Sequence, residues 1–173
     1  MLRLIISLML LGTWAYADMK ILESDKIDAH VIVKDSEYKL VFFGYAGCYH
    51  FCDPRLRQID PIYTDLKKSL DIKVLFVDIS EDRNLSASKN FVHDVNKEFE
   101  AINPDHKTVM SLQKKFQDVY IRKLPDGEYL HSGFLYLLKK ENGKYYLVKT
   151  YLEFTKSAII VNDIEKLVGS TRK

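Results

Sequence analysis

The residues with the clearest capacity for chemistry are Cys48 and Cys52, the only two cysteines in the 173-residue chain. Thiolates act as nucleophiles, as redox partners and as soft metal ligands. The segment 49–51 separates the two, one residue more than in the usual C-x-x-C redox motif. A disulfide across so short a loop would remove little entropy from the unfolded chain, so stability alone is a poor reason for the pair. The spacing therefore indicates a site that uses the thiols.

The cysteines lie where a predicted strand passes into a predicted helix. Residues 38–45 form an apolar and aromatic run that is typical of a buried strand. After Cys52, Asp53 can cap a helix and Pro54 suits its first turn, and apolar residues then recur at helical spacing. The N-terminus of this helix would lower the pKa of a nearby thiol and favour the thiolate.

Strands and helices alternate along the rest of the chain, with no internal repeat, linker or low-complexity tract. We expect an entry strand at 29–33, and Asn142-Gly143 is typical of a hairpin turn. Further elements are expected as strands at 72–79, 99–102, 133–139 and 145–152, and as helices at about 85–97, 105–120 and 156–168. This order predicts an α/β fold, a thioredoxin-like sandwich whose central mixed sheet is flanked by helices.

Composition indicates one globular domain. Hydrophobic residues make up 47% of the chain, and its 26 basic and 24 acidic side chains leave a formal net charge of +2 with no long run of like charge. Such a balance argues against nucleic acid as a partner.

The N-terminal segment has the features of a secretory signal peptide. Arg3 precedes an apolar stretch at 4–12, and Ala15-Tyr16-Ala17 is a small-x-small cleavage site. We expect residues 1–17 to be removed, which leaves a single domain of residues 18–173; the alternative is an uncleaved N-terminal anchor. We therefore predict an exported protein, in a compartment where a close cysteine pair can form a disulfide bond.

Several motifs together resemble the Sco/SenC family of exported copper chaperones for cytochrome c oxidase assembly. Residues 41–48, followed by Cys52, resemble the strand and C-x-x-x-C loop of that family. Residues 76–78 and 81–83 resemble its strand ending in Val-Asp-Pro and the charged loop after it, and 129–132 is similar to its Asp-His-Ser segment.

The likeness covers about residues 31–168 and includes three departures. Tyr49 stands where a proline usually follows the first cysteine, Leu130 replaces the aspartate before His131, and Ile79 stands where a proline is common.

The resemblance implies a ligand set and a function. Cys48, Cys52 and His131 would bind copper as Cu(I) or Cu(II), because soft sulfur suits Cu(I) and an added nitrogen with an open position permits Cu(II). The protein would deliver copper to a cytochrome c oxidase subunit in the bacterial periplasm, either soluble or tethered to the inner membrane. Other copper chaperones or thioredoxin-like reductants would be further partners. Such a chaperone would not be an enzyme.

Other functions remain open at this point. A thiol-disulfide oxidoreductase would use Cys48 as nucleophile and Cys52 as resolving thiol, to keep the cysteines of an oxidase copper site or another exported protein reduced, and His131 would be dispensable. A peroxiredoxin is disfavoured because its Pro-x-x-x-Thr/Ser-x-x-Cys motif is absent before Cys48. A structural or interaction role is the remaining alternative.

Other polar and aromatic residues are weaker candidates for the site. His50 could be a fourth ligand but is expected to point to solvent, and Asp78 is expected to be a solvated carboxylate at a strand end. His30, His93 and His106 are expected on the surface or as caps. Tyr49 and Phe51 could form an apolar docking rim or pack within the domain.

Overall fold

The computed structural model describes residues 21–22, 35–116 and 121–171. The predicted signal peptide, the predicted entry strand at 29–33 and His30 lie outside these ranges. Among the described residues, every helix is too short or too polar to span a bilayer.

A mixed sheet forms the centre of the fold, in the order β1-β8-β7-β2-β3-β4. The parallel strands β2, β3 and β4 lie side by side, and β7, β8 and β1 extend the sheet antiparallel from β2. The strands are β1 Ile21–Leu22, β2 Tyr38–Gly44, β3 Ile72–Asp78, β4 Glu100–Ile102, β7 Leu135–Glu141 and β8 Lys144–Tyr151. The mixed sheet and its flanking helices confirm the predicted α/β sandwich.

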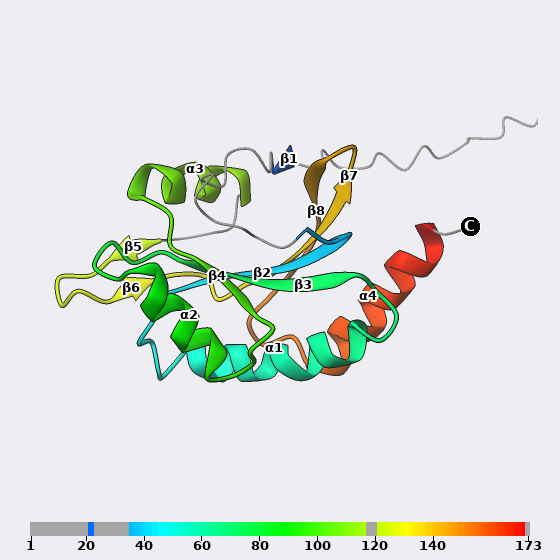
Figure 1. Cartoon of the computed structure of the whole chain (residues 1–173), viewed down its shortest axis with the longest axis horizontal. Helices are drawn as coiled ribbons and strands as arrows, with labels where there is room; N and C mark the ends of the chain where they lie inside the picture. Colours follow the sequence, from blue (N-terminus) through cyan, green and yellow to red (C-terminus); the bar gives the residue numbers. More distant parts are fainter. Residues whose placement is uncertain (1–20, 23–34, 117–120, 172–173) are drawn as a thin grey trace, which may run out of the picture.

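Helices cover both faces of this sheet. They are α1 Cys52–Leu66, α2 Leu85–His93, α3 His106–Phe116 and α4 Ser157–Thr171. Figure 1 shows α1 and α4 packed side by side against one face, with α3 over the opposite face. α2 ends earlier than predicted, at His93. A small hairpin of β5 Arg122–Lys123 and β6 Tyr129–Leu130, which the sequence analysis did not predict, lies outside the main sheet.

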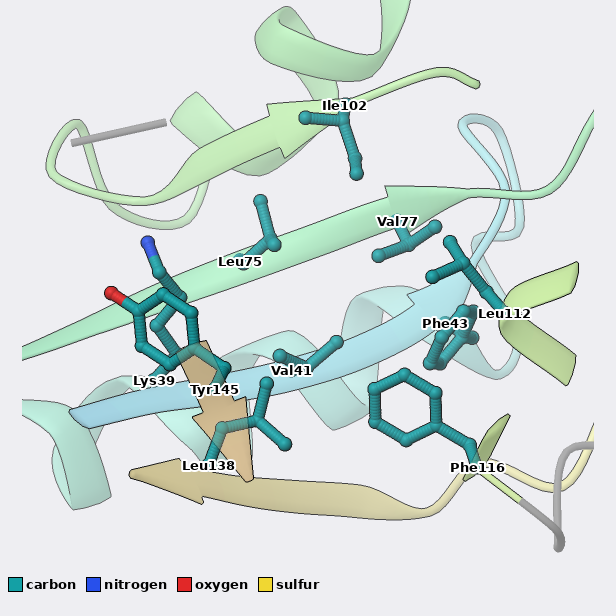
Figure 2. Close-up of a pocket in the computed structure, with 10 residues that line it drawn as sticks. All are labelled: Lys39, Val41, Phe43, Leu75, Val77, Ile102, Leu112, Phe116, Leu138 and Tyr145. Carbon is teal, nitrogen blue, oxygen red and sulfur yellow. The ribbon is translucent and has the colours of Figure 1, made fainter. Parts of the chain in front are cut away.

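Alternation along β2 divides the core between the two faces. Leu40 and Phe42 are fully buried on the side of α1, whereas Val41 and Phe43 face α3. Figure 2 shows the apolar pocket on the α3 side, where Phe43 and Phe116 lie at one end and Lys39 lies at the other.

The predicted β7–β8 hairpin is confirmed. Asn142 and Gly143 have φ values of 52° and 77°. Positive φ at both central residues is what a two-residue hairpin turn of this hand requires, which explains the Asn-Gly pair.

Candidate metal centre

The three residues that the resemblance points to lie together at the end of the sheet where β2 meets α1. One potential ligand atom from each of Cys48, Cys52 and His131 lies within 4.8 Å of the others. His131 Nε2 is 3.4 Å from Cys52 Sγ. Across residues 21–22, 35–116 and 121–171, no other group of three or more His, Cys, Asp or Glu side chains has such an arrangement.

The loop between β2 and α1 places the two cysteines. A Cβ atom at Gly44 would lie 2.9 Å from Cys52 Sγ and 2.8 Å from the Phe76 ring, so only glycine lets the end of β2 approach Cys52 this closely. The chain then turns through Gly47, whose φ is 91°, and the backbone N–H of Cys48 donates to the carbonyl of Tyr45 (3.2 Å). Helix α1 begins after this turn, with Cys52 as its first residue.

The predicted cap of this helix is wrong in one detail. The N-cap position belongs to Phe51, which makes no side-chain cap hydrogen bond, and Asp53 lies in the first turn. The Asp53 carboxylate instead pairs with Arg57 one turn later (2.8 Å). Helix α1 therefore begins at the cysteine loop itself, where the N–H of Cys52 donates to Cys48 Sγ and that of Asp53 to the Cys48 carbonyl.

The two thiols have opposite electrostatic surroundings. Interaction with the Cys52 thiol first, and then with His131 and the backbone N–H groups of Cys52 and Phe51, lowers the pKa of Cys48 to about 4. The Cys52 N–H donates to Cys48 Sγ at 3.3 Å, as the position at a helix N-terminus predicts. Cys52 is fully buried, and burial together with the Cys48 thiolate and Asp78 raises the pKa of its thiol. The two cysteines are not joined by a disulfide in this structure, and the lowered pKa of Cys48 favours its thiolate form.

Asp78 is not the solvated carboxylate that the sequence analysis expected, because it is fully buried at the end of β3. Its Oδ1 accepts hydrogen bonds from the backbone N–H (2.9 Å) and hydroxyl (2.6 Å) of Ser80. Its Oδ2 accepts from the backbone N–H of Ala46 (3.1 Å) and from the Ser88 hydroxyl (2.7 Å). Asp78 thus ties the cysteine loop to β3 and α2.

Aromatic rings enclose His131, and its hydrogen-bond contact with Cys52 Sγ is made through Nε2. Phe51, Phe42 and Tyr45 surround the imidazole, with ring centroids at 5.2, 6.0 and 6.3 Å and steep interplanar angles. His131 Nδ1 is buried and has no hydrogen-bond partner in the described part of the chain. Edge-to-face contacts of this kind fix ring orientation at modest energy. Packing of these rings therefore orients the imidazole so that Nε2 faces the sulfurs.

The absence of a side chain at Gly133 leaves room for the Phe51 ring in this aromatic group. A Cβ atom at Gly133 would lie 2.5 Å from Phe51 Cζ, and the φ of 66° is itself one that glycine favours. The sequence analysis did not predict this contact, because the residues that make it are far apart in the chain.

The remaining candidates lie outside the ligand group. His50 is exposed and is not in the cluster, and the side chain of Tyr49 is 70% exposed. Phe51 packs within the domain, so of the two residues considered for a docking rim only Tyr49 is exposed. His106 pairs with Glu81 on the surface (2.7 Å).

Two thiol sulfurs and one imidazole nitrogen can act chemically in two ways. As ligands they suit a soft or borderline transition metal and leave a coordination position open, because structural metal sites usually close with a fourth ligand. As a dithiol they can exchange with disulfides, with the low-pKa Cys48 as the attacking thiolate.

Comparison with known proteins identifies relatives in sequence and in fold. The profile of the family described as SCO1/SenC matches residues 33–169. No curated protein matches the chain closely enough to count as a relative.

Solved structures match over most of the chain at low identity. Arabidopsis thaliana ScoI with copper bound is 17% identical, with a TM-score of 0.70 over 78% of this chain and 85% of that one. A SCO1/SenC family lipoprotein from Bacillus anthracis is 16% identical, with a TM-score of 0.65 over 77% and 82%. The thioredoxin domain of a thiol-disulfide oxidoreductase from Bacteroides vulgatus is 16% identical, with a TM-score of 0.53 over 77% and 80%. These likenesses confirm the thioredoxin-like fold.

Proposed function

The chain belongs to the SCO1/SenC family, and from that premise we propose that it is a copper chaperone that binds one copper ion through Cys48, Cys52 and His131. The observation that carries the proposal is the convergence of these three side chains within 4.8 Å. The copper-bound relative from Arabidopsis thaliana supports copper as the metal. Copper is the cargo of such a protein, and the residues around the site serve to take it up and release it.

The donor set fits both oxidation states of copper. Two sulfurs favour Cu(I), and the imidazole together with an open position makes Cu(II) acceptable. With three protein ligands, a ligand from an acceptor can bind the copper before a ligand of this chain dissociates. Copper would then move to the acceptor without release as a free ion. We propose a copper-binding subunit of cytochrome c oxidase as the acceptor.

Export is part of the same proposal. Residues 1–17 would direct the chain to the cell envelope, and residues 18–173 would form the copper-binding domain in the periplasm, soluble or tethered to the inner membrane. The similar protein from Bacillus anthracis is described as a SCO1/SenC family lipoprotein, which supports the tethered form. Other copper chaperones or thioredoxin-like reductants would supply copper or keep the thiols reduced.

Competition for Cu(I) between the reduced chain and a chelator tests this function. We expect the wild type to bind one equivalent, and His131→Ala to lose affinity by at least about tenfold, because a missing ligand removes far more than a lost outer-shell contact. His106→Ala, which removes an exposed histidine outside the cluster, is the matched control and should bind like the wild type. Failure of the wild type to hold copper would overturn the proposal.

A thiol-disulfide oxidoreductase is the second candidate, and the asymmetry of the thiols favours it. Cys48 has a pKa lowered to about 4, whereas Cys52 is fully buried with a raised pKa. In this reaction the Cys48 thiolate attacks a substrate disulfide to form a mixed disulfide. Cys52 then attacks the Cys48 sulfur, so the substrate leaves with two thiols while Cys48 and Cys52 are oxidised to a disulfide. A reductase should keep its rate in His131→Ala, whereas a chaperone should lose copper in the same variant.

A further inference from the structure

Some of the exposed apolar side chains are next to the candidate ligands in the chain. In the described ranges, six large hydrophobic side chains are exposed: Tyr49, Met110, Leu130, Leu152, Phe154 and Ile159. Tyr49 lies between the two cysteines, and Leu130 precedes His131. Exposed apolar side chains beside a functional site are candidates for an interaction surface.

Leu152 and Phe154 belong to a loop that is held firmly against the start of α1. Arg55, one turn after Cys52, donates from Nη1 to the carbonyl of Glu153 (2.8 Å) and from Nη2 to that of Leu152 (3.3 Å). Gln58 donates to the carbonyl of Thr155 (2.9 Å). Arg55 is itself buried, which is uncommon for arginine. A buried guanidinium thus holds a surface loop in one conformation.

The loop adjoins the segment that carries His131. A Cβ atom at Gly133 would lie 3.5 Å from Glu153 Cγ and 2.5 Å from the Phe51 ring. Phe51 in turn packs on the His131 ring, with centroids 5.2 Å apart. The loop therefore continues the surface beside the ligand histidine.

Phe154 is the most exposed of the six, at 88%, and Leu152 is 59% exposed. The side chains of Arg55 and Gln58 donate hydrogen bonds to the loop carbonyls and fix its backbone. The side chains of Leu152 and Phe154 nevertheless remain exposed to water. An aromatic side chain on a fixed backbone loses little conformational entropy when a partner covers it, and such residues are frequent hot spots.

We propose that Leu152 and Phe154, with Leu130 and Tyr49, form the docking surface for the protein that receives copper from this chain. This inference rests on the proposed function. We call these four residues the docking surface. The partner it fits is a metal-binding domain whose sulfur or imidazole ligands lie within an apolar surface.

Burial of the ligands is the reason for this choice of occupant. Cys48 is only 8% exposed and Cys52 not at all. An acceptor ligand can reach the metal only if the acceptor lies directly on the surrounding surface. During transfer each acceptor bond to copper forms as one from this chain breaks, copper keeps its oxidation state, and a proton lost by an acceptor thiol is balanced by one gained by a released cysteine. The docking surface would be covered while this exchange proceeds.

The test compares copper transfer from the Cu(I)-loaded chain to two acceptors. One is the soluble copper-binding domain of a cytochrome c oxidase subunit, and the other is the small chelator bathocuproine disulfonate. The variant is Leu152→Ser with Phe154→Ser; its control is Met110→Ser, an exposed apolar residue on α3. Loss of two hot-spot side chains should slow transfer to the protein domain by about tenfold or more. Capture by the chelator and copper affinity should stay unchanged, and the control should transfer like the wild type.

Three other results would contradict the proposed docking surface or its partner. If the wild type transfers copper and the double variant transfers it as fast, the docking surface is wrong while the proposed function stands. If the wild type binds copper but does not transfer it to the oxidase domain, both the proposed acceptor and this occupant are wrong. A wild-type dimer in sedimentation that the double variant converts to a monomer would assign the surface to a second copy of the chain instead.

Discussion

The two segments that bring the candidate ligands together are held in different ways. The cysteine segment is fixed by directional polar contacts: Asp78 accepts a hydrogen bond from the Ala46 backbone, and the Cys52 N–H donates to Cys48 Sγ. The histidine segment is fixed by packing, since His131 lies among three aromatic rings and its Nδ1 has no partner among the described residues.

This difference is informative because a metal-binding histidine usually donates its second ring N–H to an oxygen acceptor. Without such an acceptor, the ring nitrogen that carries the proton is not fixed by a hydrogen bond. The polar segment should therefore respond to removal of hydrogen-bonding groups and to pH, whereas the aromatic segment should respond to changes of volume.

The largest expected effect comes from breaking the polar segment at Asp78. Asp78→Ala leaves two buried N–H groups and two buried hydroxyls without their acceptor, so we expect the free energy of unfolding to fall by about 3 to 5 kcal/mol. Urea unfolding of the reduced chain measures this change. Asp82→Ala removes an exposed carboxylate paired with Lys123 and should cost less than about 1 kcal/mol. A loss at Asp78 as small as that at Asp82 would show that the network does not hold the loop.

The aromatic segment should be most sensitive at Gly133. Gly133→Ala introduces a Cβ atom 2.5 Å from Phe51 Cζ at a φ of 66°, and overpacking together with backbone strain should cost about 2 to 4 kcal/mol. Gly127→Ala is the matched control, because its φ is 90° but nothing lies within 4 Å of the added atom. Thermal unfolding of both variants isolates the Phe51 contact as the difference between them. Equal losses would mean that Phe51 is free to move aside.

A smaller effect is expected when the ring beside His131 is reduced. Phe51→Leu keeps an apolar side chain but removes the edge-to-face contact, so copper affinity should fall by roughly tenfold, as for other residues that orient a ligand. Chelator competition measures the change. Phe91→Leu, which alters a ring that packs on Tyr49 and Phe76, should leave copper affinity unchanged. Equal affinity in Phe51→Leu and the wild type would mean that ring packing does not orient His131.

The last test is the pH dependence of the polar segment, to which the two cysteines contribute in opposite senses. The pKa of Cys48 lies near 4 in the folded chain, below the 9.0 of an ordinary thiol. This thiolate contributes stability that is fully present above pH 9 and is lost as the pH falls toward 4. Cys52 acts in the opposite sense, since its raised pKa lowers stability once an unfolded thiol would ionise.

Thiolate absorbance near 240 nm follows this titration in the reduced chain. One thiolate should persist down to about pH 5 and disappear in Cys48→Ser, whereas Cys52 should stay protonated at pH 8. A single transition near the pKa of an ordinary thiol would contradict the asymmetry between the cysteines.

Local patterns were sufficient to predict the backbone elements that carry the site. The apolar run before Cys48 and the helical spacing after Cys52 predicted the strand-to-helix junction, and the Asn142-Gly143 turn predicted the hairpin. The short strand at 99–102 is confirmed as β4 Glu100–Ile102. Each of these features depends on residues close together in the chain.

Contacts between distant segments were not predictable in the same way. Burial of Asp78 depends on donors from the cysteine loop and α2, and the group of rings around His131 joins β2, the cysteine loop and the segment before β7. The fixed loop at Leu152 depends on a buried Arg55 that, in sequence, is one more polar residue of an amphipathic helix. Side-chain partners of this kind are set by tertiary packing, which periodicity does not encode.

X-ray absorption of the reduced chain loaded anaerobically with one equivalent of copper tests the central claim most directly, with His131→Ala measured beside the wild type. We expect two sulfur ligands and one nitrogen ligand in the wild type, with the nitrogen absent in His131→Ala. A copper site with fewer than two sulfurs, or one whose nitrogen survives the loss of His131, would contradict the assignment of Cys48, Cys52 and His131 as the metal centre.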